Sequence, residues 1–130
     1  MGRTIGDAGY RRHTIADVRR WLVDGNNVMG SRPDGWWRDR RAGMQRLVND
    51  LDDLVERTGD SVDVVFDGRD EALQATRVFV SFAGHADDVI AARARPGFTV
   101  VTSDAELVGR VRAKGAEVVG ARALLDRLGT

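Results

Sequence analysis

Short runs of apolar residues alternate along this chain with segments in which apolar residues recur at helical spacing. The apolar runs lie at residues 21–24, 62–66, 77–82, 98–102 and 117–119. Near-continuous apolar runs are typical of parallel strands covered on both faces, and helices that join such strands form right-handed βαβ units. The alternation therefore predicts an α/β fold with a parallel sheet of about five strands flanked by helices.

Helices and one long loop are predicted between these strands. The glycines and the proline of residues 26–37 predict a loop there. Gly59 is placed to cap the C-terminus of the first and longest helix, and the S-x-x-E sequence from Ser103 to Glu106 has the form of a capping box. The predicted helices are residues 38–57, 87–94, 103–114 and 121–128.

The N-terminal residues differ from the rest of the chain. Residues 1–19 lack periodicity, so we expect a flexible tail with one docking turn at 15–18. Residues 20–130 then form a single domain, which suits a chain of 130 residues. There is no apolar run near the roughly 20 residues that span a bilayer and no secretory signal. We therefore expect a cytoplasmic protein without a membrane partner, as a monomer or a weak dimer.

Composition restricts the kind of metal site that the chain can form. The sequence has no cysteine and only two histidines. Disulfides and thiolate zinc sites are excluded, and a zinc site dominated by histidine is disfavoured. Any metal ion must be bound by oxygen, which favours Mg²⁺ or Mn²⁺. The 20 basic and 20 acidic residues give a net charge of zero, so bulk charge alone does not indicate a nucleic-acid partner.

Aspartates follow four of the five predicted strands. They are Asp24, Asp67, the pair Asp87 and Asp88, and Asp104. Parallel strands point their C-terminal ends at one edge of the sheet, so we expect these carboxylates to converge on one crevice. Left alone, they would repel each other and some would bind protons, whereas one or two divalent cations remove that conflict.

Such a site suits the hydrolysis of a phosphodiester. One ion lowers the pKa of a bound water, while the same ion or a second one about 4 Å away stabilises the leaving oxygen. Asn27 is neutral, so its amide can orient a water molecule or a phosphate without adding charge. No side chain then has to act as the nucleophile.

Each of these residues also has a purely structural interpretation. A carboxylate near a helix N-terminus stabilises the helix by about 0.3–1 kcal/mol, which accounts for Asp87, Asp88 or Asp104 taken singly. Asp67 and Asn27 are suited to turns. Asp24 is different, because it ends an apolar strand where no helix cap is expected. The joint occurrence of the four acids favours the metal site.

Four short motifs carry a resemblance to a known family. They are V-D-G-N-N-V at 23–28, V-F-D-G at 65–68, A-D-D-V-I at 86–90 and V-T-S-D at 101–104. In this order they resemble the NYN domains of the PIN-like nuclease superfamily, in particular the YacP-like branch. The resemblance extends from Trp21 to the C-terminus and implies a PIN-like three-layer fold. It also implies a metal-dependent endoribonuclease acting on single-stranded RNA, in this branch on messenger RNA at the ribosome.

The resemblance implies roles for individual residues as well. Asn27 corresponds to the asparagine that gives the first motif its character. At Asn26 the branch often has an aromatic residue, so this chain departs from the pattern and a stacking role there is weakened. The implied ligands of Mg²⁺ or Mn²⁺ are Asp24, Asp67, Asp87 and Asp104, with Asp88 as the alternative to Asp87.

Contacts with RNA are expected from the loop at 30–37 and from arginines near the acids. Trp36 or Trp37 can stack on an unpaired base, although a tryptophan at a helix entry often places its ring in the core. Four arginines can contact phosphates or lie on a solvated helix face paired with acids. They are Arg38, Arg40, Arg41 and Arg46. Arg69 is better placed, just beyond Asp67, whereas neither His13 nor His85 is expected to act as a base.

Other functions fit parts of this pattern. The main alternative is a non-catalytic RNA- or ribosome-binding module, although the complete set of acids argues against it. A haloacid-dehalogenase-like phosphatase needs a second aspartate two residues after Asp24, where this chain has Asn26. A receiver domain needs a lysine beyond the fifth strand, and Lys114, the only lysine, precedes that strand.

Overall fold

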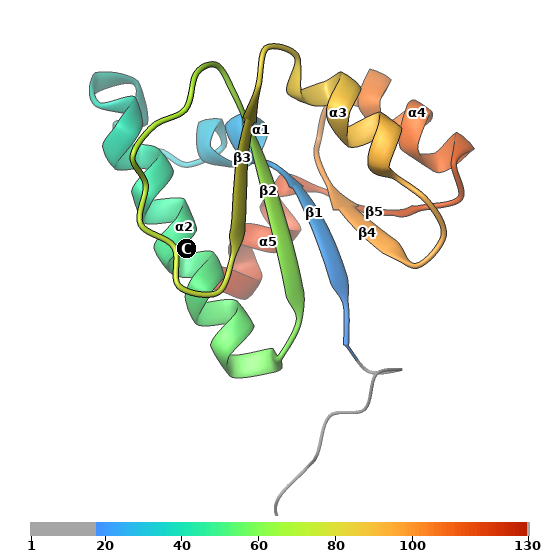
Figure 1. Ribbon diagram of the computed structural model, residues 1–130, viewed down its shortest axis with the longest axis horizontal. Coiled ribbons are helices and arrows are strands. Elements are labelled where there is room, and N and C mark those ends of the chain that lie inside the picture. The colour runs from blue at the N-terminus through green and yellow to red at the C-terminus, as the bar shows by residue number, and fades with distance from the viewer. Residues whose placement is uncertain (1–17, 130) are drawn as a thin grey trace, which may run out of the picture.

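The computed structural model describes residues 18–129 and shows a parallel sheet of five strands (Figure 1). The strand order is β3-β2-β1-β4-β5, and all four pairings are parallel. The strands are β1 (Arg20–Asp24), β2 (Ser61–Asp67), β3 (Phe79–Ala83), β4 (Phe98–Val101) and β5 (Glu117–Val119). The helices are α1 (Gly25–Gly30), the 3-10 helix η2 (Trp36–Arg38), α2 (Arg40–Thr58), α3 (Ala86–Arg93), α4 (Ala105–Ala113) and α5 (Ala121–Leu128).

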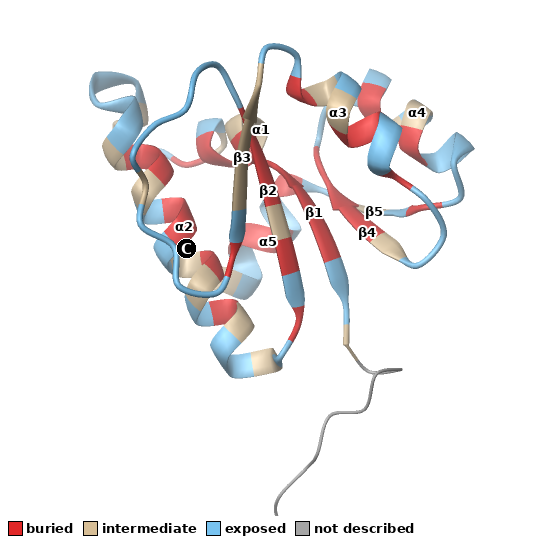
Figure 2. Cartoon of the chain, in the orientation of Figure 1, coloured by how far each residue is buried: buried red, intermediate tan, exposed pale blue. Residues whose placement is uncertain are grey.

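Helices cover both faces of the sheet, and alternate residues of each strand pack on opposite sides. On β1, Trp21 and Val23 belong to the core beneath α1, α2 and α5, whereas Leu22 belongs to the core beneath α3 and α4. Figure 2 shows the buried residues concentrated along β1, β2 and β4 and on the inner sides of the helices. Burial on both faces explains the near-continuous apolar runs, and the predicted three-layer α/β fold is confirmed.

The segment after β1 differs from the prediction. Residues 26–37 were expected to form a loop, but the structure begins a helix at Gly25 and places a second, 3-10 turn at 36–38. Gly25 lies directly on the sheet, because a Cβ atom there would be 2.5 Å from Phe66 Cδ1 and 3.0 Å from Val64 Cγ2. Close packing of α1 on β2 therefore sets the conformation of this segment, and local propensity does not.

The end of α2 agrees with the prediction, whereas the N-cap of α4 and the start of β3 differ from it. Gly59 adopts the left-handed conformation and ends α2, as predicted. The capping box is wrong: the N-cap of α4 is Asp104, and the Ser103 hydroxyl instead accepts a hydrogen bond from Ala121 N at 2.9 Å. The third strand begins later than predicted, because Asp52 of α2 accepts the backbone N–H groups of residues 76–78.

Among residues 18–129, no helix is both long and apolar enough to span a bilayer. Residues 1–17, which include His13 and all of the predicted docking turn except Val18, lie outside the described residues.

Candidate active site at the carboxyl edge of the sheet

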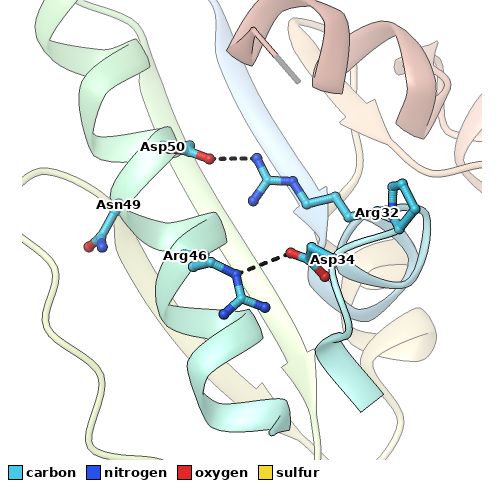
Figure 3. A pocket seen from close by; sticks show the side chains of 6 residues that line it. Arg32, Asp34, Arg46, Asn49 and Asp50 are labelled. Carbon is cyan, nitrogen blue, oxygen red and sulfur yellow. Dashed lines mark hydrogen bonds and ion pairs between the residues drawn. The ribbon is translucent and has the colours of Figure 1, made fainter. Parts of the chain in front are cut away.

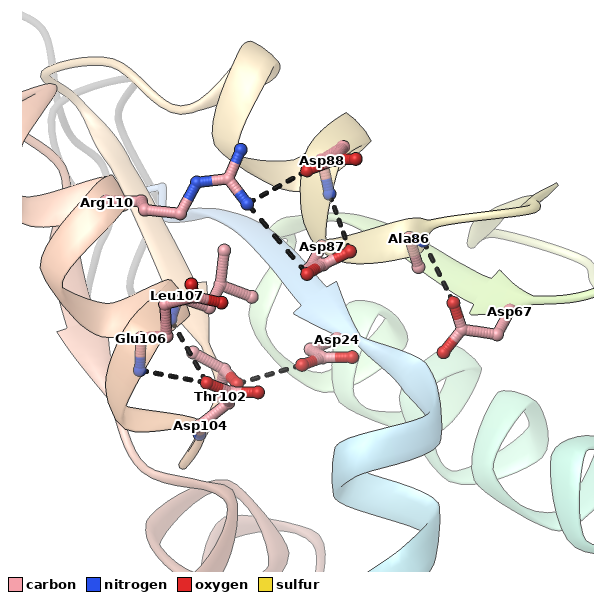
Figure 4. Close-up of polar contacts among 10 residues, drawn as sticks. All are labelled: Asp24, Asp67, Ala86, Asp87, Asp88, Thr102, Asp104, Glu106, Leu107 and Arg110. Atoms are coloured by element: carbon pink, nitrogen blue, oxygen red, sulfur yellow. Dashed lines mark hydrogen bonds and ion pairs between the residues drawn. The ribbon is translucent and has the colours of Figure 1, made fainter.

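The predicted acids lie at the carboxyl edge of the sheet, each on a different element (Figure 4). Asp24 is the last residue of β1 and Asp67 is the last residue of β2. Asp87 lies in the first turn of α3, and Asp104 is the N-cap of α4. Because these strands are parallel, residues far apart in sequence arrive at the same edge.

Asp24 is the most buried of these acids, with 8% of its surface exposed. Its Oδ2 accepts a hydrogen bond from Thr102 Oγ1 at 2.9 Å, and the same Oγ1 accepts one from Asp104 N at 3.1 Å. Burial raises the pKa of the Asp24 carboxyl, and the hydrogen bonds from the Thr102 hydroxyl and the Asn27 backbone N–H lower it in part. The charges of Asp67 and Asp104 add a smaller increase. Thr102 was not among the predicted site residues, because only the packing reveals that it is 1% exposed.

The start of α1 at Gly25 places Asp24 at a helix N-cap, which the sequence analysis did not expect. The side chain makes no capping hydrogen bond of standard geometry. The Asn27 backbone N–H in the first turn of α1 is nevertheless close enough to lower the pKa of the Asp24 carboxyl, while Oδ2 is turned toward Thr102.

Two asparagines fix the edge around these acids. Asn26 Oδ1 accepts the backbone N–H of Asp67 at 2.7 Å, and Asn27 Oδ1 accepts that of Ser103 at 2.8 Å. Each amide ties the first turn of α1 to the end of a neighbouring strand. The oxygen of Asn27 therefore has a structural partner, and its role toward water or phosphate stays a prediction for the Nδ2 group. Asn26 was not expected to take part.

Asp87 and Asp88 share a basic partner, Arg110, which was not predicted from the sequence. Arg110 Nη1 of α4 lies 2.9 Å from Asp88 Oδ1 and 3.8 Å from Asp87 Oδ2. The Asp87 side chain is 44% exposed against 62% for Asp88. Figure 4 shows Asp87 on the side of α3 that faces Asp24 and Asp88 farther from it. The geometry favours Asp87 over Asp88 as the acid that belongs to the edge.

The donor atoms at this site suit a divalent metal ion, but the side chains are not close enough together to form a complete set of ligands. Asp24, Asp67 and Asp104 offer the hard oxygen donors that Mg²⁺ and Mn²⁺ prefer. Asp67 Oδ1 accepts from Ala86 N, and Asp104 Oδ1 accepts from Glu106 N and Leu107 N, so each is held by one oxygen. Across the described residues, however, no three acidic or histidine side chains converge closely enough to bind one ion.

The residues predicted to contact RNA differ in exposure and in whether their side chains are bound within the chain. Trp36 is half-buried and packs against the core, whereas Trp37 is 59% exposed. Arg41 donates to the Ala72 carbonyl oxygen, so it is engaged with its own chain. Arg40 and Arg69 are exposed. His85 is the N-cap residue of α3 and makes no side-chain capping bond.

A separate pocket lies between α2 and the loop after α1 (Figure 3). It has a volume of about 450 Å³, and its lining residues are Arg32, Pro33, Asp34, Arg46, Asn49 and Asp50. Arg32 is buried and binds Asp50 Oδ2 at 2.5 Å, and Arg46 Nε binds Asp34 Oδ2 at 3.1 Å. Each arginine pairs with an acid, although Arg32 Nε is buried without a hydrogen-bond partner. Arg46 and part of the loop at 30–37, which were predicted to contact RNA, line this pocket, whereas none of the predicted metal ligands does.

Comparisons with known proteins match this chain to one family and to crystal structures of one protein. A family model described as the YacP-like NYN domain matches residues 21–130. The chain is similar to a crystal structure of Rae1 (YacP) from Bacillus subtilis, with 26% sequence identity and a TM-score of 0.73, covering 86% of this chain and 74% of that one. A tryptophan-to-leucine mutant of Rae1 matches with 27% identity and a TM-score of 0.73, covering 86% and 76%. No curated protein gives a significant match.

Proposed function

This chain belongs to the YacP-like NYN domain family, and from that premise we propose that it is a Mg²⁺- or Mn²⁺-dependent endoribonuclease that cuts single-stranded RNA. Family membership and the similarity to Rae1 indicate an RNA nuclease in general terms. The metal dependence, the endonucleolytic cut and an association with messenger RNA at the ribosome are the finer parts of the proposal.

The placement of Asp24 is the observation that supports this function most strongly. A buried carboxylate needs partners, and among the described residues Asp24 has the Thr102 hydroxyl and the Asn27 backbone N–H but no basic side chain. Two further acids lie near enough for their charges to raise its pKa. Asp24, Asp67 and Asp104 have no basic partner within residues 18–129, and such charge at the carboxyl edge of a parallel sheet suits a site for a cation and its substrate.

The residues of the site have distinct tasks in this mechanism. Asp24, Asp67, Asp87 and Asp104 would hold the cation, which supplies positive charge to the phosphodiester and activates the attacking water. Thr102 fixes the orientation of the Asp24 carboxylate. The Asn26 and Asn27 bridges keep the ends of β2 and β4 at a fixed distance from α1. No protein side chain acts as the nucleophile.

One observation favours a second candidate, a non-catalytic RNA- or ribosome-binding module. The acids of the described chain do not converge in a group of three, so a complete set of metal ligands is not preformed. Such a module would use the same edge and the same arginines to contact RNA and would leave the phosphodiester intact.

Cleavage of a labelled single-stranded RNA separates the two. We expect internal cuts with Mn²⁺ or Mg²⁺, none with EDTA, and none with the Asp24→Asn variant. Cleavage that persists in EDTA or in Asp24→Asn contradicts the metal-dependent mechanism. Binding of the RNA by wild type without any cleavage supports the module. Co-sedimentation of the Asp24→Asn variant with ribosomes tests the ribosomal part, and its absence from the ribosomal pellet contradicts it.

A further inference from the structure

We propose that Trp37, Arg38 and Arg40 form a stacking platform that holds one unpaired base of the RNA and the phosphates beside it. This inference rests on the proposed function, because the platform would serve the RNA that the acidic edge cuts. Only Trp37 and Phe79 are large apolar side chains exposed to solvent among residues 18–129. Trp37 lies on η2, a short 3-10 turn that leads into α2.

The turn that carries Trp37 is fixed by contacts on both sides. Asp34 Oδ1 accepts the backbone N–H of Trp36 at 3.1 Å, while Asp34 Oδ2 binds Arg46 Nε at 3.1 Å. Trp36 packs so closely over Gly43 that a Cβ atom at that glycine would lie 2.9 Å from Trp36 Cβ. Trp36 is therefore the anchor of the turn, and Trp37 is the residue that the turn presents to solvent.

The chemistry around Trp37 matches that of single-stranded RNA. Arg38 Cζ lies 5.6 Å from the centre of the Trp37 ring, and the Trp36 ring meets it edge-on, with centroids 6.1 Å apart. Arg38 and Arg40 form no ion pair within the described residues, whereas the neighbouring Arg41 and Arg46 are engaged with Ala72 and Asp34. The Arg38 guanidinium lies over one face of the exposed Trp37 ring, and Arg40 at the start of α2 is exposed. The remaining face of the indole can stack a base while the two arginines contact phosphates.

The platform also lies where an RNA that crosses the acids can reach it. The helix α1 begins directly after Asp24, and η2 packs against both α1 and α2. Figure 1 shows η2 and the first turn of α2 toward the carboxyl ends of the strands, on the opposite side of α1 from α3 and α4. An RNA held between Asp87 and Asp24 would continue over α1 toward Trp37. Stacking requires an unpaired base, so the platform would select single strands over duplexes.

The test measures RNA binding in the Asp24→Asn background with EDTA present, so that cleavage does not enter. A fluorescent 12-nucleotide single strand is titrated by anisotropy. We expect Trp37→Ala to raise the Kd about 5- to 100-fold, since base stacking on an aromatic side chain has a worth of that order. Trp37→Phe retains most of the affinity, and Phe79→Ala, which removes the other exposed aromatic ring, leaves it unchanged. Arg38→Ala and Arg40→Ala reduce the salt dependence of binding.

The outcomes distinguish the platform from the nuclease. Equal Kd values for Trp37→Ala and its parent, with unchanged circular dichroism, overturn the platform even where wild type cleaves RNA. A Trp37-dependent Kd in a protein that never cleaves supports the platform and contradicts the nuclease. Trp37→Ala that weakens duplex binding as much as single-strand binding contradicts base stacking. A Trp37→Ala effect on self-association alone, seen by analytical ultracentrifugation, shows a protein contact instead and overturns the proposal.

Discussion

Two acidic regions of this molecule differ in how their charges are satisfied. On α2, Asp50 pairs with the buried Arg32, and Asp52 accepts three backbone N–H groups from residues 76–78. At the carboxyl edge, Asp24, Asp67 and Asp104 form no ion pair with any described basic residue, and two of them raise the pKa of the third. The α2 acids stabilise the fold. Asp67 and Asp104 also accept backbone N–H groups, but Asp24 is buried without a basic partner, and that cost is one that a bound cation can offset.

The same comparison shows why the pocket under the loop is not the functional centre. The pocket has two arginines, and both pair with aspartates. At the acid edge, Asp24, Asp67 and Asp104 have no basic partner among the described residues. Charge without a basic partner is the better indicator of chemistry.

The largest difference is expected when one acid of each region is neutralised. Asp24→Asn should lower RNA cleavage by more than about 100-fold, because loss of a metal ligand costs more than loss of an outer partner. Its melting temperature at pH 7 should stay the same or rise. The pKa of Asp24 is raised in the folded state, so the contribution of Asp24 to the free energy of unfolding is present below its unfolded pKa and is lost as the pH rises through the folded pKa. At pH 7 that contribution is absent, and Asp24→Asn does not remove it.

The matched change on α2 is Asp50→Asn. It leaves the buried Arg32 without its acid, and should cost about 1–3 kcal/mol of unfolding free energy while cleavage per folded molecule is kept. Urea denaturation and activity assays on both variants provide the test. A stable Asp50→Asn variant that has lost cleavage would remove the distinction between the regions.

A methyl group at Gly25 tests how rigidly the edge is built. Gly25→Ala places a Cβ atom 2.5 and 2.6 Å from two atoms of the Phe66 ring, so either α1 or the ring must shift. We expect a loss of about 1–3 kcal/mol, as for other overpacked cores, together with reduced cleavage. Gly30→Ala is the control at the other end of α1, because its Cβ atom would lie 3.7 Å from Trp36 Cζ2, an ordinary contact. Equal stability of the two variants would contradict the close packing of α1 on β2.

Asp52 gives the opposite pH dependence from Asp24. Burial alone would raise the pKa of Asp52, but the hydrogen bonds from Thr76, Arg77 and Val78 lower it below 3.8 overall. Its contribution to stability is therefore present above pH 3.8 and lost as the pH falls through the lower folded value. Asp52→Asn should cost about 1 kcal/mol at pH 7 and progressively less as the pH falls below 3.8. Thermal melts across this range, with the exposed Asp53→Asn as control, would show a constant difference if this account were wrong.

The smallest effect is expected for Arg110, whose ion pairs are largely exposed. Arg110→Ala should change stability by less than about 1 kcal/mol. It frees Asp87 from a competing cation, so we expect tighter Mn²⁺ binding, which isothermal titration calorimetry measures directly. Weaker Mn²⁺ binding would show instead that Arg110 holds Asp87 in the binding orientation. The Arg110→Lys variant, which keeps the charge, should behave like wild type.

Much of the architecture follows from the sequence, because strand and helix periodicity are local properties. The alternation of apolar runs with helical segments predicts parallel βαβ units, and parallel strands must end at one edge. An aspartate at the end of β1 and another at the end of β2 therefore lie at the same edge, before the strand order or any side-chain contact is known. Gly59 likewise ends α2 through its own backbone freedom.

The tertiary structure decided what depends on distant partners. The helix that begins at Gly25 packs directly on Phe66 and Val64 of β2. Asp104, and not Ser103, caps α4, while the Ser103 hydroxyl accepts a hydrogen bond from Ala121 N. Packing over Gly43 decides that Trp36 is the anchor and Trp37 the exposed ring. Three side-chain pairings could not be predicted, because the spacing of their partners in the sequence follows no helix or strand period. They join Arg32 to Asp50, Arg110 to Asp87 and Asp88, and Thr102 to Asp24. Burial and charge pairing depend on segments that meet only in the folded chain, whereas a local pattern specifies only its own element.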